Sequence, residues 1–252
     1  MPAEEVTPAI VLRNRDYSES DRIVSLLTRD VGKLSGIAKG AKQSRRRFER
    51  KLELFSHVML YFRRRPHGDL VFITRAEAGE LPPYDLSDDL GKIALGSYMV
   101  ELADALTREG TDTSEPYRIL AAALGALARH GASAALRQAF ELQLLRWAGY
   151  ELEFRQCRLC AAAPGAQAQT LTFVPTRGGI VCSRCRDGIN VAGAIALGAA
   201  SAAALARLGA APIETASEAE PGGSDGALAI ARFVASVLDR RLRSLQFLDT
   251  IL

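Results

Sequence analysis

The residues best suited to chemistry in this sequence are four cysteines, which form two C-x-x-C pairs. The pairs are Cys157 with Cys160 and Cys182 with Cys185, and 21 residues separate them. Each pair can present two thiolates from a tight turn, and four thiolates satisfy the tetrahedral preference of Zn²⁺. The separation is one residue longer than the usual spacing of such sites. We therefore predict one structural zinc ion, bound by these four cysteines.

Two alternatives to zinc remain open at this stage. Disulfides are uncommon in a cytoplasmic chain, and a redox pair would need only one C-x-x-C. A catalytic zinc ion is not expected, because four cysteines leave no coordination position for water. The arginines that flank the cysteines are expected to favour the thiolate form; they are Arg155, Arg158, Arg184 and Arg186.

A second feature is a basic segment between Lys33 and Lys51, in which eight basic residues accompany one acid, Glu49. Residues 1–80 hold 16 Lys and Arg against 11 Asp and Glu, whereas the remainder holds 16 against 18. Such segregation of charge favours a polyanion partner. Binding of these cations to a phosphate backbone would be favoured by the release of counterions. The predicted DNA contacts are Lys33, Lys39, Lys42, Arg45, Arg46, Arg47, Arg50, Lys51, Arg63, Arg64 and Arg65. A solvated loop is the alternative.

Aromatic residues near this segment could stack on bases. The candidates are Tyr17, Phe48, Phe55, Tyr61 and Phe62, although Phe55 and Tyr61 fit core positions equally well.

Catalytic motifs are not found. The three histidines lie in no H-E-x-x-H pattern, and no G-x-S-x-G or Walker A sequence occurs. Asp16, Glu19 and Asp21 could hold Mg²⁺ for phosphodiester cleavage. A solvated turn is the simpler explanation of these acids, so we expect a protein that is not an enzyme.

The elements that must position these residues divide the chain near residue 80. Five short β-rich runs precede that point, at residues 8–13, 22–28, 33–38, 55–62 and 70–75. This density of strands favours a small barrel over residues 1–80, and the five-stranded OB-fold is the natural candidate. Periodicity alone leaves an SH3-like barrel open.

Helical periodicity follows over residues 81–252, after the break Leu81-Pro82-Pro83. Ser87 and Asp88 could cap a first helix, Pro116 could open a second, and Ser133 could start a third that ends before Gly149. An insert at 152–190 carries the cysteines, and helical patterning resumes at 191–208. We expect a flexible connector at 210–226 and a last helix over 227–245. The fold class predicted is an α+β multidomain protein.

Composition agrees with a soluble protein. The 252 residues are 48% hydrophobic and 24% charged, with a net charge of +3. No apolar run reaches the ~20 residues that a membrane helix needs, and acids stand at Glu4 and Glu5, where a signal peptide would carry positive charge. We expect a cytoplasmic chain, monomeric on its own, with no membrane partner.

Several segments together resemble the RecO family. Residues 9–13 (AIVLR), 17–23 (YSESDRI), 32–34 (GKL) and 38–40 (AKG) resemble its N-terminal OB domain. Residues 140–145 (FELQLL) resemble the helix that leads into its zinc knuckles. Residues 178–185 (GGIVCSRC) and 241–248 (RLRSLQFL) resemble its later landmarks. The resemblance is collinear and covers nearly the whole chain.

This resemblance implies a recombination mediator of the RecFOR pathway in the bacterial cytoplasm, at the nucleoid during repair. Such a protein binds single- and double-stranded DNA, anneals complementary strands and, with RecR, helps RecA displace single-strand-binding protein. The family often carries glycine after the second cysteine, where this chain has Ala161, so a slightly different knuckle turn is expected. The alternative function is a zinc-ribbon and OB scaffold that binds protein and has no annealing activity.

Overall fold

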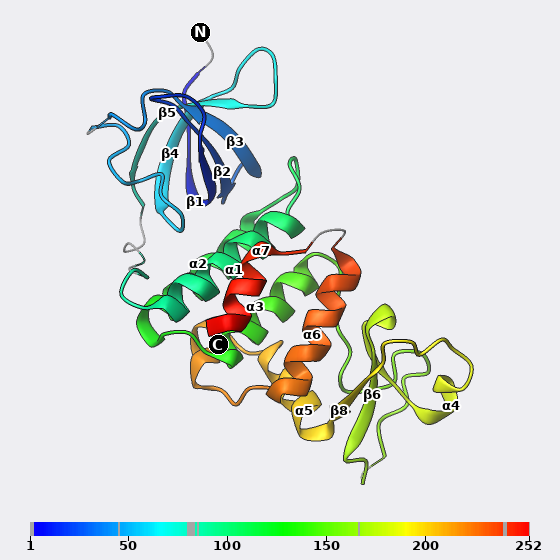
Figure 1. The fold of residues 1–252 in the computed structure, drawn as a ribbon. Helices are drawn as coiled ribbons and strands as arrows, with labels where there is room; N and C mark the ends of the chain where they lie inside the picture. The colour runs from blue at the N-terminus through cyan, green and yellow to red at the C-terminus, as the bar shows by residue number, and fades with distance from the viewer. Residues whose placement is uncertain are drawn as a thin grey trace. The chain divides into compact units, whose positions relative to one another are not determined.

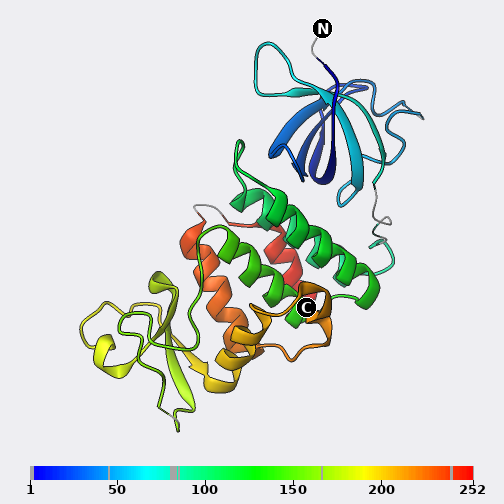
Figure 2. The same cartoon turned by 180° about the vertical axis from the view of Figure 1, so that it is seen from behind.

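The computed structural model of the chain describes residues 3–44, 46–79, 84, 86–165, 167–238 and 241–251. Contacts divide the chain into two compact units, residues 1–129 with 243–252, and residues 130–242. Figures 1 and 2 show the elements of each unit from opposite sides. The predicted break at 81–83 lies outside the described residues.

A closed five-stranded barrel forms the beginning of the first unit, drawn in blue to cyan in Figure 1. Its strands are β1 (Glu5–Asp16), β2 (Arg22–Thr28), β3 (Lys33–Ala38), β4 (His57–Arg63) and β5 (Val71–Ala78). They follow one another around the barrel in the order β1-β2-β3-β5-β4, with β3 and β5 parallel and the other pairs antiparallel. This order is that of an OB-type barrel, so the predicted fold is confirmed and the SH3-like alternative is set aside.

The barrel closes because alternate side chains of its strands point inward. In β4 the inward residues are Val58, Leu60 and Phe62, all essentially inaccessible to solvent. At the junction of β3 and β5, a Cβ atom on Gly36 would lie 2.7 Å from Ile73 Cγ1, so only glycine allows the two strands to approach closely enough to pair.

Three helices complete the first unit: α1 (Leu90–Leu106), α2 (Ser114–His130, of which the last residue falls in the second unit) and α7 (Arg243–Ile251). Asp89, not the predicted Ser87 or Asp88, caps α1, because its side chain accepts a hydrogen bond from the Lys92 N–H. The Glu101 carboxylate of α1 accepts hydrogen bonds from the backbone N–H groups of Arg243 and Ser244. These bonds attach the start of α7 to α1.

The second unit contains α3 (Ala134–Trp147), the cysteine-bearing segment and two further helices. Ser133 caps α3 as predicted, since its Oγ accepts the Leu136 N–H. The other elements are β6 (Thr170–Val174), η1 (Pro175–Arg177), β7 (Gly179–Val181), α4 (Ser183–Arg186), β8 (Ile195–Gly198), α5 (Ala199–Leu208), η2 (Ile213–Glu218) and α6 (Gly223–Val237). The strands form one small sheet in the order β7-β6-β8.

The sequence-based prediction of helices fails at two places after residue 190. The helix expected over 191–208 begins only at Ala199, because residues 195–198 pair with β6 as strand β8. The last helix, expected over 227–245, is two helices, α6 and α7. No helix in the described part of the chain is long and apolar enough to cross a membrane.

The segment 210–226, predicted as a flexible connector, consists of packed structure. It contains η2 and the first turn of α6, and η2 packs against α3 with Ile213 and Ala216 buried. The buried Gln138 side chain of α3 accepts a hydrogen bond from the Gly222 N–H at 2.7 Å. The Pro and Gly residues that suggest mobility serve here as turns between packed pieces.

Candidate metal centre and nucleic-acid interface

Two tight turns present the four cysteines. In the first turn the Cys157 N–H donates to the Ala162 carbonyl at 2.8 Å, and the Ala161 N–H donates to the Cys157 carbonyl at 2.9 Å. The second turn follows β7, where the Cys185 N–H donates to the Cys182 carbonyl at 3.1 Å as α4 begins. The β6–β7 hairpin carries this second turn, so strand pairing sets its position.

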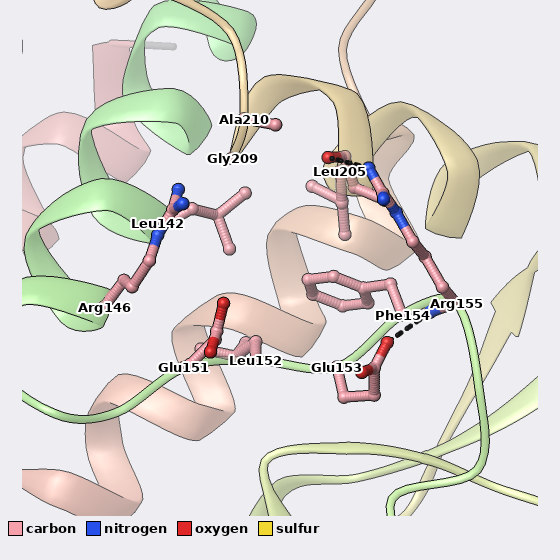
Figure 3. A pocket seen from close by; sticks show the side chains of 11 residues that line it. Leu142, Arg146, Glu151, Leu152, Glu153, Phe154, Arg155, Leu205, Gly209 and Ala210 are labelled. Atoms are coloured by element: carbon pink, nitrogen blue, oxygen red, sulfur yellow. Dashed lines mark hydrogen bonds between the residues drawn. The ribbon is translucent and has the colours of Figure 1, made fainter. Parts of the chain in front are cut away.

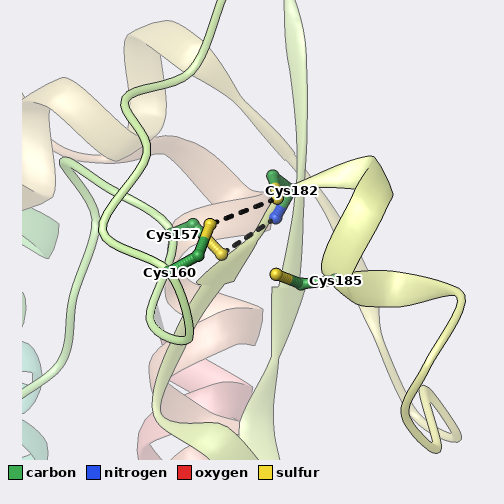
Figure 4. Close-up of side chains that lie close together, drawn as sticks. All are labelled: Cys157, Cys160, Cys182 and Cys185. Atoms are coloured by element: carbon green, nitrogen blue, oxygen red, sulfur yellow. Dashed lines mark hydrogen bonds between the residues drawn. The ribbon is translucent and has the colours of Figure 1, made fainter.

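The sulfur atoms of these turns converge on one point (Figure 4). All four lie within 4.8 Å of one another, and the Sγ atoms of Cys160 and Cys182 are 3.7 Å apart. A disulfide needs about 2.05 Å, and the four cysteines are free thiols. In a tetrahedral ZnS₄ centre, Zn–S bonds of about 2.3 Å place the sulfurs about 3.8 Å apart. The sulfurs are therefore close to the spacing that a tetrahedral metal ion requires.

The pKa values of these thiols differ because the groups compete for ionisation. Burial raises the pKa of Cys157, but hydrogen bonds from the backbone N–H groups of Cys182, Leu159 and Cys160 outweigh it and lower the pKa to about 6. The pKa of Cys185 is raised to about 12, chiefly by its contacts with the sulfurs of Cys160 and Cys182. Backbone N–H groups, rather than the expected arginines, dominate the first shift. A metal ion bound to all four sulfurs would stabilise the thiolate form of each cysteine, so the thiols would no longer compete for ionisation.

The basic segment leaves β3 as a loop that the barrel holds in place. Phe48 and Leu52 of this loop are buried in the barrel core. At its start, the Gly40 N–H donates to Asp21 Oδ1 at 2.9 Å, and the Lys42 N–H donates to the Ser20 carbonyl at 3.0 Å. Residues 39–52, which we call the basic loop, therefore have a defined base.

Three predicted contacts on the basic loop are exposed and have side chains with no hydrogen-bond partner among the described residues. They are Lys39, Arg46 and Arg50, and none forms an ion pair with another described residue. Lys51 is half-buried, and Arg45 lies outside the described residues. These three cations are thus available to a polyanion.

Lys33, another of the predicted DNA contacts, is mostly shielded from solvent. Its side chain is only 14% exposed, and its ammonium lies 2.7 Å from the carboxylate of buried Asp104. It also donates to the carbonyls of Asp104 and Thr107, at 2.7 and 3.3 Å. Carbonyls at the C-terminal end of a helix lack partners within the helix and attract a cation. Lys33 is therefore used to join the barrel to α1.

Four further predicted cations have partners within the chain. Lys42 pairs with Asp16 at 2.9 Å, and Arg47 donates to the Lys39 carbonyl at 3.0 Å. Arg64 pairs with Glu5 at 2.9 Å, and Arg63 lies 3.9 Å from Glu4. Only Arg65 of the 63–65 cluster is exposed with no ion pair to a described residue. Exposed pairs of this kind are weak and can exchange for phosphate.

The aromatic candidates separate by burial. Phe48 and Phe62 lie in the barrel core, so they are not stacking residues. The ring of Tyr61 is covered by Arg75, whose guanidinium carbon lies 3.7 Å from its centroid. Tyr17 is 63% exposed in the β1–β2 turn, the same turn that holds the basic loop. It is the candidate best placed to stack on a base beside that loop.

The acids proposed for Mg²⁺ support the loop instead. Asp16 pairs with both Lys42 and Arg22, and Asp21 accepts the Gly40 N–H. Among the described residues, the cysteines form the metal-ligand cluster, and these acids do not join one.

The structure also gathers cations that sequence analysis did not single out. Arg13, Arg15 and Arg108 line one cleft of the first unit, on the outer side of β1, β2 and β3 at the end of α1. The spacing of Arg13 and Arg15, two positions apart in a predicted strand, could have indicated that they share one face of the barrel. Nothing in the sequence linked them to Arg108.

Two family models match the chain. The model described as "Recombination protein O N terminal" matches residues 1–81, and "Recombination protein O C terminal" matches residues 87–246. A DNA repair protein RecO of Anaeromyxobacter sp. (strain Fw109-5) is 38% identical over 249 residues, covering 96% of this chain and 94% of that protein.

More distant relatives carry the same name. DNA repair protein RecO of Myxococcus xanthus (strain DK1622) is 34% identical over 254 residues and 96% of each chain. DNA repair protein RecO of Symbiobacterium thermophilum is 32% identical over 247 residues, covering 96% of this chain and 95% of that one. The match spans both units and the cysteine turns, and the chain belongs to the RecO family of DNA repair and recombination proteins.

Proposed function

We propose that this protein is a non-enzymatic recombination mediator that binds single- and double-stranded DNA through its barrel and anneals complementary strands. The observation that carries this proposal is the basic loop, which presents Lys39, Arg46 and Arg50 from a base anchored in the barrel core. Ordered cations lose less conformational freedom when they bind phosphate than cations on a mobile tail. Tyr17 would add stacking on a base beside the loop.

Annealing follows from neutralising charge on two strands at once. Two complementary strands repel each other through their phosphates, and a surface that replaces their counterions lowers that repulsion. We further propose the partners that the family resemblance implies: RecR, single-strand-binding protein and, indirectly, the RecA filament.

For the metal, we propose one structural Zn²⁺ held by Cys157, Cys160, Cys182 and Cys185. The all-thiolate donor set is one that Zn²⁺ prefers, and the sulfur spacing fits its tetrahedral geometry. Its contribution would be to fix the turns of the second unit rather than to activate a substrate.

The test of DNA binding is a salt series with fluorescent single-stranded oligonucleotides and the zinc-loaded full chain. Lys39→Ala/Arg46→Ala/Arg50→Ala should reduce the slope of log affinity against log salt by about 2, because each lost phosphate contact removes about 0.7. The matched control is Arg118→Ala/Arg207→Ala/Arg232→Ala, which removes three exposed helix arginines. Equal slopes for the two variants would favour the protein-binding scaffold.

A further inference from the structure

A cleft of about 530 Å³ lies in the first unit, where the outer faces of β1, β2 and β3 meet the end of α1. Strand residues Arg13, Arg15 and Lys33 line one side, and Arg108 with Glu109 lines the other. The cleft is separate from the exposed cations of the basic loop, none of which lines it.

The charges that line this cleft do not balance. Four cations, Arg13, Arg15, Lys33 and Arg108, face two acids, Asp104 and Glu109. Asp104 is already shared, because both Arg13 and Lys33 form ion pairs with it. Arg15 and Arg108 are exposed and form no ion pair with a described residue. Two guanidinium groups therefore remain for an anion.

The other groups of the lining are mostly small and polar. They are Asn14, Ser25, Ser35 and Thr107, each of which already donates a hydrogen bond within the chain. Among the described residues that line the cleft, Ile23 is the one with an apolar side chain. The two exposed guanidinium groups suit phosphate oxygens, whereas an apolar ligand would find little apolar surface to cover.

A cleft in the second unit shows that arginines alone do not create this imbalance. There, Arg146 and Arg155 are accompanied by Glu151 and Glu153 (Figure 3). Arg155 is further occupied, since its Nη2 donates to the Ala206 carbonyl at 3.3 Å. Two cations against two acids leave no excess charge for an anion.

One hydrogen bond links the lining of the first cleft to the end of the basic loop. The Asn14 side chain lines the cleft and donates to the carbonyl of Leu52, the loop's core anchor, at 2.8 Å.

We propose that this cleft is a second phosphodiester site, in which Arg15 and Arg108 bind the backbone of a nucleic-acid strand that the basic loop also contacts. The inference rests on the proposed DNA binding and adds a path for the strand along β1. Asp104 acts there as a positioning residue, since it holds Arg13 and Lys33 at the cleft wall.

The test uses the zinc-loaded full chain and the variant Arg15→Ala/Arg108→Ala, with oligo(dT) binding followed by fluorescence anisotropy across a salt series. We expect the salt slope to fall by about 1.4, the contribution of two phosphate contacts on a single strand. Arg207→Ala/Arg232→Ala, two exposed arginines on helices of the second unit, is the matched control and should keep the native slope. Circular dichroism and thermal unfolding establish that each variant is folded.

The outcomes separate this inference from the proposed function. If the native chain binds no DNA at low salt, the proposed function fails and the cleft site fails with it. If the native chain binds and the folded cleft variant matches the control, only the cleft site is overturned. Pyrophosphate binding provides a further test. If Arg15→Ala/Arg108→Ala abolishes pyrophosphate binding but leaves the salt slope of DNA binding unchanged, the cleft binds small phosphates and the proposal is overturned.

Discussion

Lys33 and Arg46 belong to the same basic segment, yet their side chains have opposite surroundings. Lys33 is mostly buried and bonded to Asp104 and to the last carbonyls of α1, whereas Arg46 is exposed. The sequence composition does not distinguish Lys33 from Arg46, because it gives the charge of a side chain and not its direction. Strand alternation predicts that Lys33 lies on the outer face of β3, but not that a helix 70 residues later lies against it.

Asp104 should be important for stability. Replacing it with Asn leaves the Lys33 ammonium without a counter-charge in a largely buried position, and we expect a loss of about 3 kcal/mol in the free energy of unfolding. Urea denaturation of the native chain and Asp104→Asn measures it. Arg118→Ala, which removes an exposed ion pair with Glu115, is the control and should change stability by less than about 1 kcal/mol.

The same carboxylate predicts a pH dependence. Burial opposes its ionisation, but Lys33 and Arg13 outweigh burial and hold the pKa of Asp104 below its ordinary value. Its stabilisation is therefore complete above the unfolded-state pKa of about 3.9 and is lost as pH falls through the lower folded-state pKa. The stability gap to Asp104→Asn should be constant from neutral pH to about pH 5 and should narrow below about pH 4. A gap that widens in acid would contradict this assignment.

Ala161, the residue directly after the second cysteine, has a backbone conformation that favours glycine. Its φ is 57°, in the left-handed region where a Cβ atom costs about 1–2 kcal/mol. Ala161→Gly should therefore stabilise the zinc-loaded second unit by about 1 kcal/mol, which thermal unfolding measures. Ala162→Gly, at a neighbouring position with ordinary φ, should give no gain; an equal gain from both would exclude backbone strain as the cause.

At the scale of elements, the segment that carries the cysteine turns has only a small hydrophobic core. Cys157, Val174 and Val181 are the buried members of their small core, and the accompanying sheet has three short strands. Such a module would obtain much of its folding free energy from the proposed metal ion.

Metal removal should therefore disorder the segment 152–190 while the barrel stays folded. Hydrogen exchange before and after chelation measures this, with β1 to β5 as the internal reference. Protection of β6 and β7 that survives complete metal loss would show that packing alone folds the segment.

The segment from η2 to α6 gives the sharpest test of a corrected element. Ile213 is 1% exposed, so Ile213→Ala should destabilise the protein by about 2–4 kcal/mol. Thr215→Ala, an exposed position in the same element, is the control and should have a small effect. An equally small effect at Ile213 would restore the flexible connector.

Elements with strong local signals were predictable from the sequence. The five strands, the Ser133 cap and the cysteine turns each have a clear period or spacing. Residues 191–226 lacked a reliable signal. The alanine-rich run at their start has a high helix propensity, yet part of it pairs with β6 as strand β8. Tertiary contacts with β6 and α3 determine the secondary structure and packing of these residues.

For the whole molecule, the sequence predicted the kind of site better than its members. The cysteine cluster was complete in the sequence, since its spacing alone defines it. The predicted basic surface kept Lys39, Arg46 and Arg50 but lost Lys33 to α1. Arg108 could join it only through the fold, which brings the end of α1 to the barrel. Charge asymmetry therefore predicts a polyanion partner, and the structure shows which of the predicted contacts have exposed side chains.

Strand annealing tests the central claim most directly. Two complementary oligonucleotides, one carrying a fluorophore and the other a quencher, would be mixed with the native protein and with Lys39→Ala/Arg46→Ala/Arg50→Ala, without nucleotide or added metal. The native chain should accelerate annealing, salt should suppress that acceleration, and the folded, zinc-loaded triple variant should lose most of it. Equal acceleration by the native chain and the triple variant, or none by the native chain at low salt, would contradict the assignment of the basic loop as the annealing surface.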